Sequence, residues 1–162
     1  MQVITSRHEI KSRTEQCLIA YRNKGLEIFV EEFHSNVLEQ KVKFPLLEYC
    51  ATLLYEEIPL KEHIQFCDRV EALKTIGGNV IIGMFLQKKL QDNFELALKK
   101  AAEYISYADA WYICDIVGER VWGMGLLKQP SKVIPEIEKL FTHENRWVVR
   151  SLGAGIHYSI KK

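Results

Sequence analysis

The sequence lacks any apolar run long enough to cross a lipid bilayer, and charged residues interrupt its first 20 positions. Neither a membrane span nor the apolar core of a secretory signal is therefore expected, and a cytoplasmic location is predicted. Cysteine is also scarce, with four residues at positions 17, 50, 67 and 114. Their spacing matches neither a metal knuckle nor a redox pair, which predicts reduced thiols buried as small apolar side chains.

A strong charge of one sign is absent as well. The 162 residues carry a net charge of +1, far below that of a dedicated nucleic-acid-binding tail. The two halves differ, however. Residues 1–81 hold 10 basic against 12 acidic side chains, whereas residues 82–162 hold 12 basic against 9 acidic. The mildly basic second half is compatible with a polyanionic partner.

The sequence also has no convincing run of alternating apolar and polar residues, which a half-buried strand would require. Apolar residues instead recur at helical spacing along almost the whole chain. A chain of this length is large enough for one substantial core. We therefore predict an all-α protein with residues 1–162 in a single helical-repeat domain.

Turn and cap signals indicate where the helices begin and end. Thr5 or Ser6 can start the first helix, Gly25 ends it, and prolines at 45, 59 and 130 mark later helix starts. Asp92-Asn93 is expected to form a turn and cap before a further helix, and Thr142 is expected to cap the last one. In the second half, helix pairs recur at roughly 35 residues, over 76–106 and 109–141, before a last helix from 143. This period predicts a solenoid of HEAT-like antiparallel helix pairs, with an irregular helical bundle as the alternative.

The last helix is apolar on much of its surface, whereas a terminal repeat usually presents a polar cap. Two explanations are open. The chain is a fragment of a longer protein, or another subunit covers this helix. Self-association through the C-terminal helix is therefore one expectation.

An acid lies within the aromatic and aliphatic segment DAWYICDIVGERVW. At 100° per residue, Trp111, Asp115, Gly118 and Trp122 fall on one helical stripe, opposite a wide aliphatic face. An acid flanked by aromatic rings and a glycine predicts a concave surface open to a flat, cationic or sugar-like ligand. The alternative is that both tryptophans pack in the core and that Asp115 caps a neighbouring helix.

Three motifs in the second half resemble the DNA alkylation repair family, which includes the AlkD-like DNA glycosylases built from HEAT-like repeats. They are S-Y-x-D-x-W-x-x-x-D from Ser106 to Asp115, G-L-L-x-x-P from Gly125 to Pro130, and N-R-W-V-V-R-S from Asn145 to Ser151. The likeness covers roughly residues 40–162. It implies a right-handed α-helical solenoid whose basic concave groove holds duplex DNA, and it implies that family repeats beyond residue 162 are missing here.

The resemblance also implies roles for individual residues. Asp115 would be the catalytic carboxylate, Trp111 its aromatic neighbour, and Arg150 an arginine that faces the DNA backbone. Further DNA contacts are expected from the following residues: Arg146, Trp147, Trp122, Lys88 and Lys89. Lesions excised by such enzymes are cationic N3- or N7-alkylpurines, so the base needs no general acid and one carboxylate suffices.

The expected function is therefore hydrolysis of the N-glycosidic bond of alkylated purines in duplex DNA, without a metal or other cofactor. A second hypothesis is a HEAT-like scaffold or a DNA- or protein-binding module without catalytic activity, which the weak net charge favours. A zinc site at His63 and Cys67 is disfavoured because no further ligand pair lies nearby in the sequence.

Overall fold

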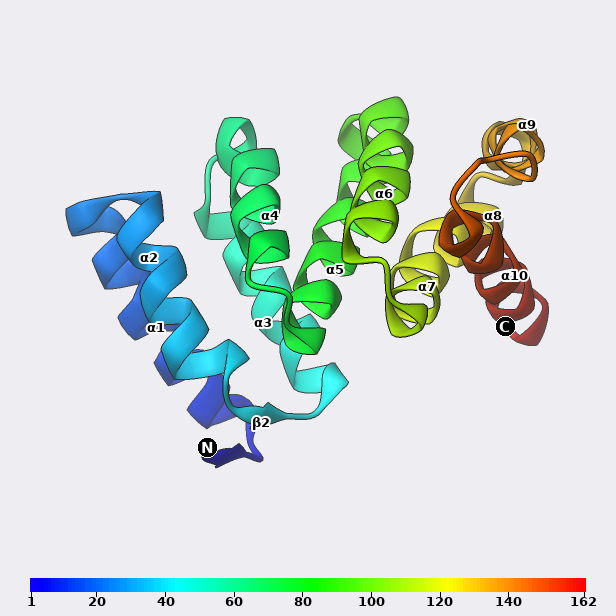
Figure 1. Cartoon of the computed structure of the whole chain (residues 1–162). Coiled ribbons are helices and arrows are strands. Elements are labelled where there is room, and N and C mark those ends of the chain that lie inside the picture. The colour runs from blue at the N-terminus through cyan, green and yellow to red at the C-terminus, as the bar shows by residue number, and fades with distance from the viewer. The chain divides into compact units, whose positions relative to one another are not determined.

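The structure of the protein, a computed structural model, describes all residues from Met1 to Lys162. It confirms the all-α prediction, because helices form almost every element (Figure 1). Contacts between Cα atoms divide the chain into two compact units, unit 1 (Met1–Phe85) and unit 2 (Leu86–Lys162). None of the helices combines the length and the apolar character that crossing a bilayer requires.

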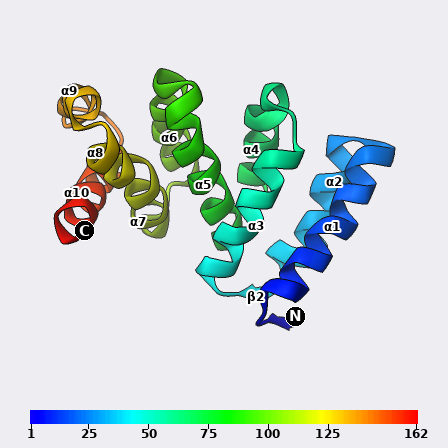
Figure 2. The same ribbon diagram turned by 180° about the vertical axis from the view of Figure 1, so that it is seen from behind.

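The first two helices of unit 1 form a hairpin. Ser6 caps α1 by accepting a hydrogen bond from the Glu9 amide, and Gly25, with φ 84°, separates α1 from α2. Both views show the two helices side by side (Figures 1 and 2). The helical elements that lie wholly within this unit are α1 (Arg7–Lys24), α2 (Leu26–Phe33), the π-helical turn η1 (His34–Leu38), α3 (Phe44–Glu57), the 3-10 turn η2 (Leu60–Glu62) and α4 (His63–Ala72).

Aromatic rings fill the centre of unit 1. Phe29 stacks on Phe33 with centroids 5.7 Å apart, and Phe66 lies 4.9 Å from Phe85, which belongs to α5 (Ile76–Asp92). Helix α1 packs against α3, and α2 packs against α4, so each member of the first helix pair contacts its counterpart in the second. These contacts hold unit 1 together through apolar burial.

Unit 1 also contains a short element that the sequence pattern did not indicate. Strand β1 (Val3–Ile4) pairs in parallel with β2 (Lys41–Val42). A two-residue strand has no room for the alternation from which strands are predicted. The pair ties the N-terminus to the chain that precedes α3.

Unit 2 consists of the end of α5 and the elements that follow it. Asn93 caps α6 by accepting a hydrogen bond from the Leu96 amide, as its sequence position predicted. Thr142 was expected to cap the last helix, but its hydroxyl donates to the Lys139 carbonyl, and Asn145 is the N-cap of that helix. The elements are α6 (Phe94–Ala108), α7 (Trp111–Gly118), the π-helical turn η3 (Glu119–Gly123), α8 (Met124–Lys128), α9 (Pro130–Leu140) and α10 (Arg146–Lys161).

The close packing of α7 and η3 against α10 organises unit 2. The residue numbers of the contacting pairs increase in step along both segments: Cys114 contacts Trp147, Gly118 contacts Ser151, and Trp122 contacts Gly155. This register means that α7 and α10 run in the same direction. Small residues bring the backbones together, since a Cβ atom on Gly118 would lie 2.6 Å from the Ser151 carbonyl oxygen.

Candidate functional site

Asp115 lies on the outer side of α7, where it is half-buried. Its carboxylate takes part in no hydrogen bond and no salt bridge within the chain. Trp111, one turn earlier, is 57% exposed, and its ring meets that of Tyr112 edge-on with centroids 6.0 Å apart. The structure therefore places an available carboxylate beside an exposed indole, as the spacing predicted for this pair.

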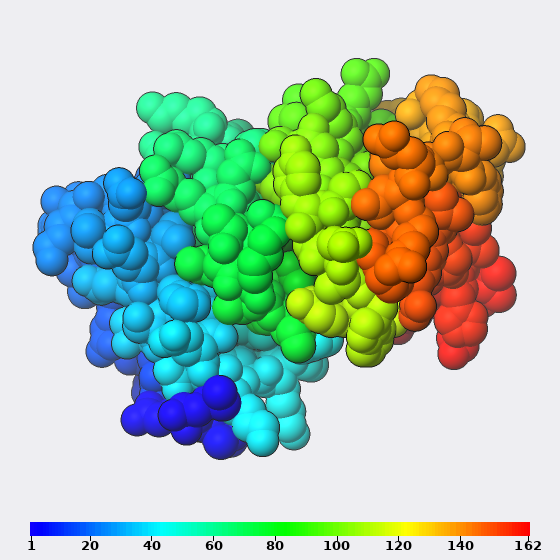
Figure 3. All heavy atoms as spheres, in the orientation of Figure 1, coloured from blue at the N-terminus to red at the C-terminus, as the bar shows by residue number.

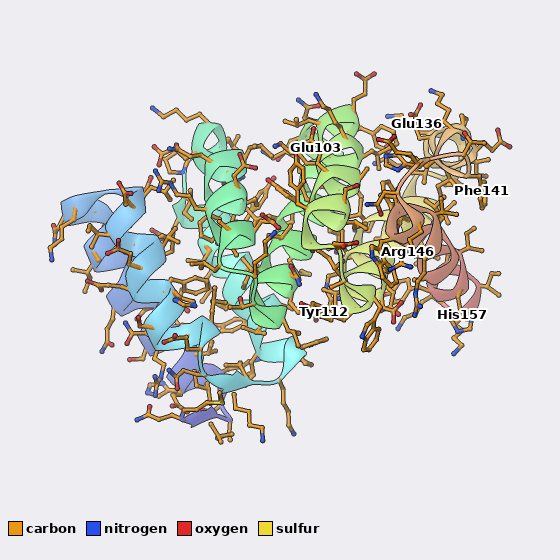
Figure 4. The ribbon with its side chains drawn as sticks, viewed as in Figure 1. Glu103, Tyr112, Glu136, Phe141, Arg146 and His157 are labelled. Carbon is orange, nitrogen blue, oxygen red and sulfur yellow. The ribbon has the colours of Figure 1, made fainter.

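A basic stripe runs along the exposed face of α10. It consists of Arg146, Arg150, Gly153, His157 and Lys161, spaced four, three, four and four residues apart, and every member is exposed. Figure 4 labels Arg146 and His157 toward the two ends of this helix. A Cβ atom on Gly153 would meet nothing within 4 Å, so a ligand can approach the backbone between the charged side chains.

Trp147, at the start of α10, is held from several directions. Its indole Nε1 donates a hydrogen bond of 2.6 Å to Asp109 Oδ1, from the corner between α6 and α7. Its amide donates to the side chain of Asn145, the N-cap of α10, and its carbonyl accepts from the Cys114 thiol. Arg146 places its guanidinium carbon 4.4 Å from the centroid of the indole ring. The first turn of α10 is thus fixed to the α6–α7 corner.

The Cys114 thiol lies in the seam where α7 packs against α10, and its pKa responds to the charges nearby. Burial raises the pKa of Cys114 to about 11, Arg150 lowers this pKa, and Asp115 raises it. Both charges therefore act on one buried atom in the seam between α7 and α10. In Figure 3 the orange segment that leads into α10 lies beside the yellow-green segment near residue 110, on one face of unit 2. Asp115 and the beginning of the basic stripe thus belong to neighbouring parts of the surface.

The structure corrects the expectation that Gly118 and Trp122 lie on the open stripe with Asp115. Gly118 is buried against α10, and Trp122 is 0% exposed, with its Nε1 hydrogen-bonded to Ser151 Oγ at 2.8 Å. The prediction that Trp122 contacts DNA is therefore wrong in this structure. A continuous α-helix was assumed, whereas the π-helical turn at 119–123 changes the rotation per residue and α10 covers that side.

The two lysines predicted to contact DNA lie on α5. Lys89 is buried, with 6% of its surface exposed, so the prediction that it meets a surface phosphate is wrong in this structure. Lys88 is half-buried, and its role stays a prediction. Sequence reasoning missed Gly153, His157 and Lys161, although their helical spacing from Arg150 was a usable signal.

No group of three or more His, Cys, Asp or Glu side chains in the described chain is arranged to hold a metal ion. Comparisons of the chain with family models, with curated proteins and with solved structures each returned no match. Function is therefore inferred from the exposed residues of α7 and α10.

Proposed function

We propose that unit 2 binds duplex DNA containing alkylated bases, and that Asp115 promotes hydrolysis of the N-glycosidic bond of a cationic N3- or N7-alkylpurine. The observation that carries this proposal is a half-buried carboxylate without an internal partner, next to the exposed Trp111. A carboxylate that served only the fold would be expected to accept hydrogen bonds from its neighbours.

The proposed reaction needs a carboxylate and an aromatic ring, and Asp115 and Trp111 supply them. Cleavage of the bond between sugar and base develops positive charge on the sugar, and a nearby carboxylate stabilises that charge or orients the attacking water. The alkylated base already carries a positive charge and leaves as a neutral molecule. Trp111 presents an aromatic face to the cationic base or the sugar, an interaction of about 0.5–2 kcal/mol. The proposed reaction requires no metal and no organic cofactor.

DNA binding is proposed to occur through the basic stripe of α10. Phosphate contacts supply most of the affinity of proteins for DNA regardless of sequence. Arginine is suited to them because its planar guanidinium can donate two hydrogen bonds to one phosphate. Arg146 and Arg150 begin the stripe, on the helix that packs against α7, so phosphates bound there would bring the duplex toward Asp115.

We also propose that the helices belong to a right-handed solenoid of HEAT-like pairs, the fold that the family resemblance implies. Within unit 1, α1 packs on α3 and α2 on α4, as expected for consecutive repeats. Within unit 2, the parallel packing of α7 and α10 fits equivalent helices of neighbouring repeats.

The second candidate function is a DNA- or protein-binding module without excision activity. The burial of Trp122 favours it, because this ring was expected to contact DNA. Trp111 is then the one tryptophan on the outer face of α7 next to Asp115. Binding by α10 would be retained, whereas excision would be absent.

The two functions are separated by incubating methylated duplex DNA with the protein and measuring the free methylpurines that are released. The first predicts release by the wild type and a loss of at least about tenfold in Asp115→Asn, which keeps the shape of the side chain but not its charge. Glu138→Gln removes an exposed acid from α9 and is the matched control, with release expected at the wild-type rate. Equal release by wild type and Asp115→Asn would contradict a catalytic role for Asp115, and DNA binding without release would support the second function.

A further inference from the structure

Asp109 occupies an unusual backbone position between α6 and α7. Its φ of 44° and ψ of 42° place it in the left-handed region, which among the non-glycine residues of the chain only Lys74 also enters with a positive φ. Its side chain is directed at α10, where Oδ1 accepts the 2.6 Å hydrogen bond from Trp147 Nε1. Asp109 therefore connects the turn before α7 with the first turn of α10.

The indole ring of Trp147 in turn contacts two arginine side chains. The guanidinium carbons of Arg146 and Arg150 lie 4.4 and 5.9 Å from the centroid of its indole. A guanidinium that rests on an aromatic face keeps its N–H groups, which lie in its own plane, available to other acceptors. The contact restricts the otherwise flexible arginine side chains and leaves their donors free for phosphate.

We propose that Asp109 is a positioning residue for DNA binding: it fixes the indole of Trp147, which holds Arg146 and Arg150 ready for phosphate. This inference rests on the proposed function and extends it to a residue that does not contact the reacting atoms. Because the arginine side chains are already ordered in the free protein, they lose less conformational entropy when DNA binds. The hydrogen bond thus contributes to affinity indirectly, through two side chains that it does not touch.

Simple electrostatics gives the opposite expectation for Asp109. An acid close to a phosphate site repels the polyanion, so removing its charge should strengthen DNA binding. The positioning role predicts that binding weakens when the hydrogen-bond acceptor is lost, even though the repelling charge is lost as well. The two effects can therefore be separated with two substitutions.

Asp109→Asn removes the charge but keeps an oxygen that can accept from the indole, whereas Asp109→Gly removes both. Asparagine and glycine each tolerate a left-handed backbone, so both variants are suited to the conformation at this position. Affinity for a fluorescent methylated duplex is measured at several salt concentrations. We expect Asp109→Asn to bind at least as tightly as the wild type and Asp109→Gly to bind about three- to tenfold more weakly than Asp109→Asn.

The dependence on salt supplies a second reading of the same titrations. Loss of an ordered phosphate contact lowers the slope of log affinity against log salt concentration by about one, and this change is expected only for Asp109→Gly. Equal affinities and slopes for the asparagine and glycine variants would overturn the positioning role.

An NMR measurement on the free protein distinguishes failure of this inference from failure of the proposed function. In Asp109→Gly the indole N–H signal of Trp147 should shift, and the Nε–H protons of Arg146 and Arg150 should exchange faster with water. In Asp109→Asn these signals should stay close to those of the wild type. A wild type that does not bind DNA would refute the proposed function, whereas unchanged arginine signals in Asp109→Gly would refute the positioning role in either case.

Discussion

Trp122 and Ser151 join two segments of unit 2 through a buried hydrogen bond. The indole Nε1 of Trp122 donates to Ser151 Oγ at 2.8 Å, and this hydroxyl donates onward to the Val148 carbonyl at 2.7 Å. Both residues have 0% of their surface exposed. The polar atom of the indole is therefore satisfied inside the core, which allows so large a ring to be fully buried.

Replacement of Ser151 by alanine is expected to destabilise the protein. The substitution leaves the indole N–H of Trp122 buried without its acceptor, which costs about 1–3 kcal/mol. Ser159→Ala is a matched control on the same helix, because Ser159 also bonds the carbonyl three residues earlier but is only half-buried. Its effect should stay within about 0.5 kcal/mol. Urea unfolding measures both, and equal free energies of unfolding would contradict the role given to this hydrogen bond.

Two glycines on α10 should respond in opposite directions to alanine. A Cβ atom at Gly155 would lie 2.5 Å from Trp122 Cβ and 2.9 Å from the Gly118 carbonyl oxygen, whereas one at Gly153 would meet nothing within 4 Å. Gly155→Ala should therefore lower the free energy of unfolding by about 1–3 kcal/mol through overpacking. Gly153→Ala should raise it by about 0.5–1 kcal/mol, because alanine favours the helix. Thermal unfolding measures both variants. A gain of stability in both would contradict the tight packing of α7 against α10.

The buried thiols predict a loss of stability in alkaline solution. Burial raises the pKa of Cys50 from 9.0 to about 12. Between these values the unfolded chain releases the thiol proton while the folded protein retains it, so the free energy of unfolding falls as pH rises. From pH 8.5 to 10.5 wild type should lose about 2 kcal/mol more than Cys50→Ala. The same pH dependence in both proteins, measured by urea unfolding, would show that Cys50 does not contribute.

Much of the helical fold could be predicted from the sequence because its signals are local. Ser6 and Asn93 cap helices, Gly25 ends α1, and Pro130 begins α9, as their positions predicted. Each signal acts on backbone groups within one turn. No such local signal predicts the π-helical turn at 119–123. Because regular α-helical spacing was assumed through this turn, Trp122 was placed on the exposed side of the helix instead of in the core.

The candidate site was predictable in part for a related reason. Trp111 and Asp115 lie one turn apart within one α-helix, so their relation follows from helical geometry alone. The hydrogen bond between Asp109 and Trp147 joins residues 38 positions apart, and it depends on how α10 docks against the α6–α7 corner. Helical periodicity does not encode that docking, because the small residues that permit it, such as Gly118 and Gly155, are compatible with several packings.

The exposed face of α10 is proposed to hold DNA phosphates. This proposal is decided by titrating a fluorescent methylated duplex with wild type and with the double variant Arg146→Ala/Arg150→Ala over a range of salt concentrations. Lys139→Ala, which removes an exposed cation from α9, is the control. We predict that the double variant binds more weakly and that its slope of log affinity against log salt concentration is lower by about two, while the control matches the wild type. An affinity and a slope unchanged in the double variant would contradict the claim.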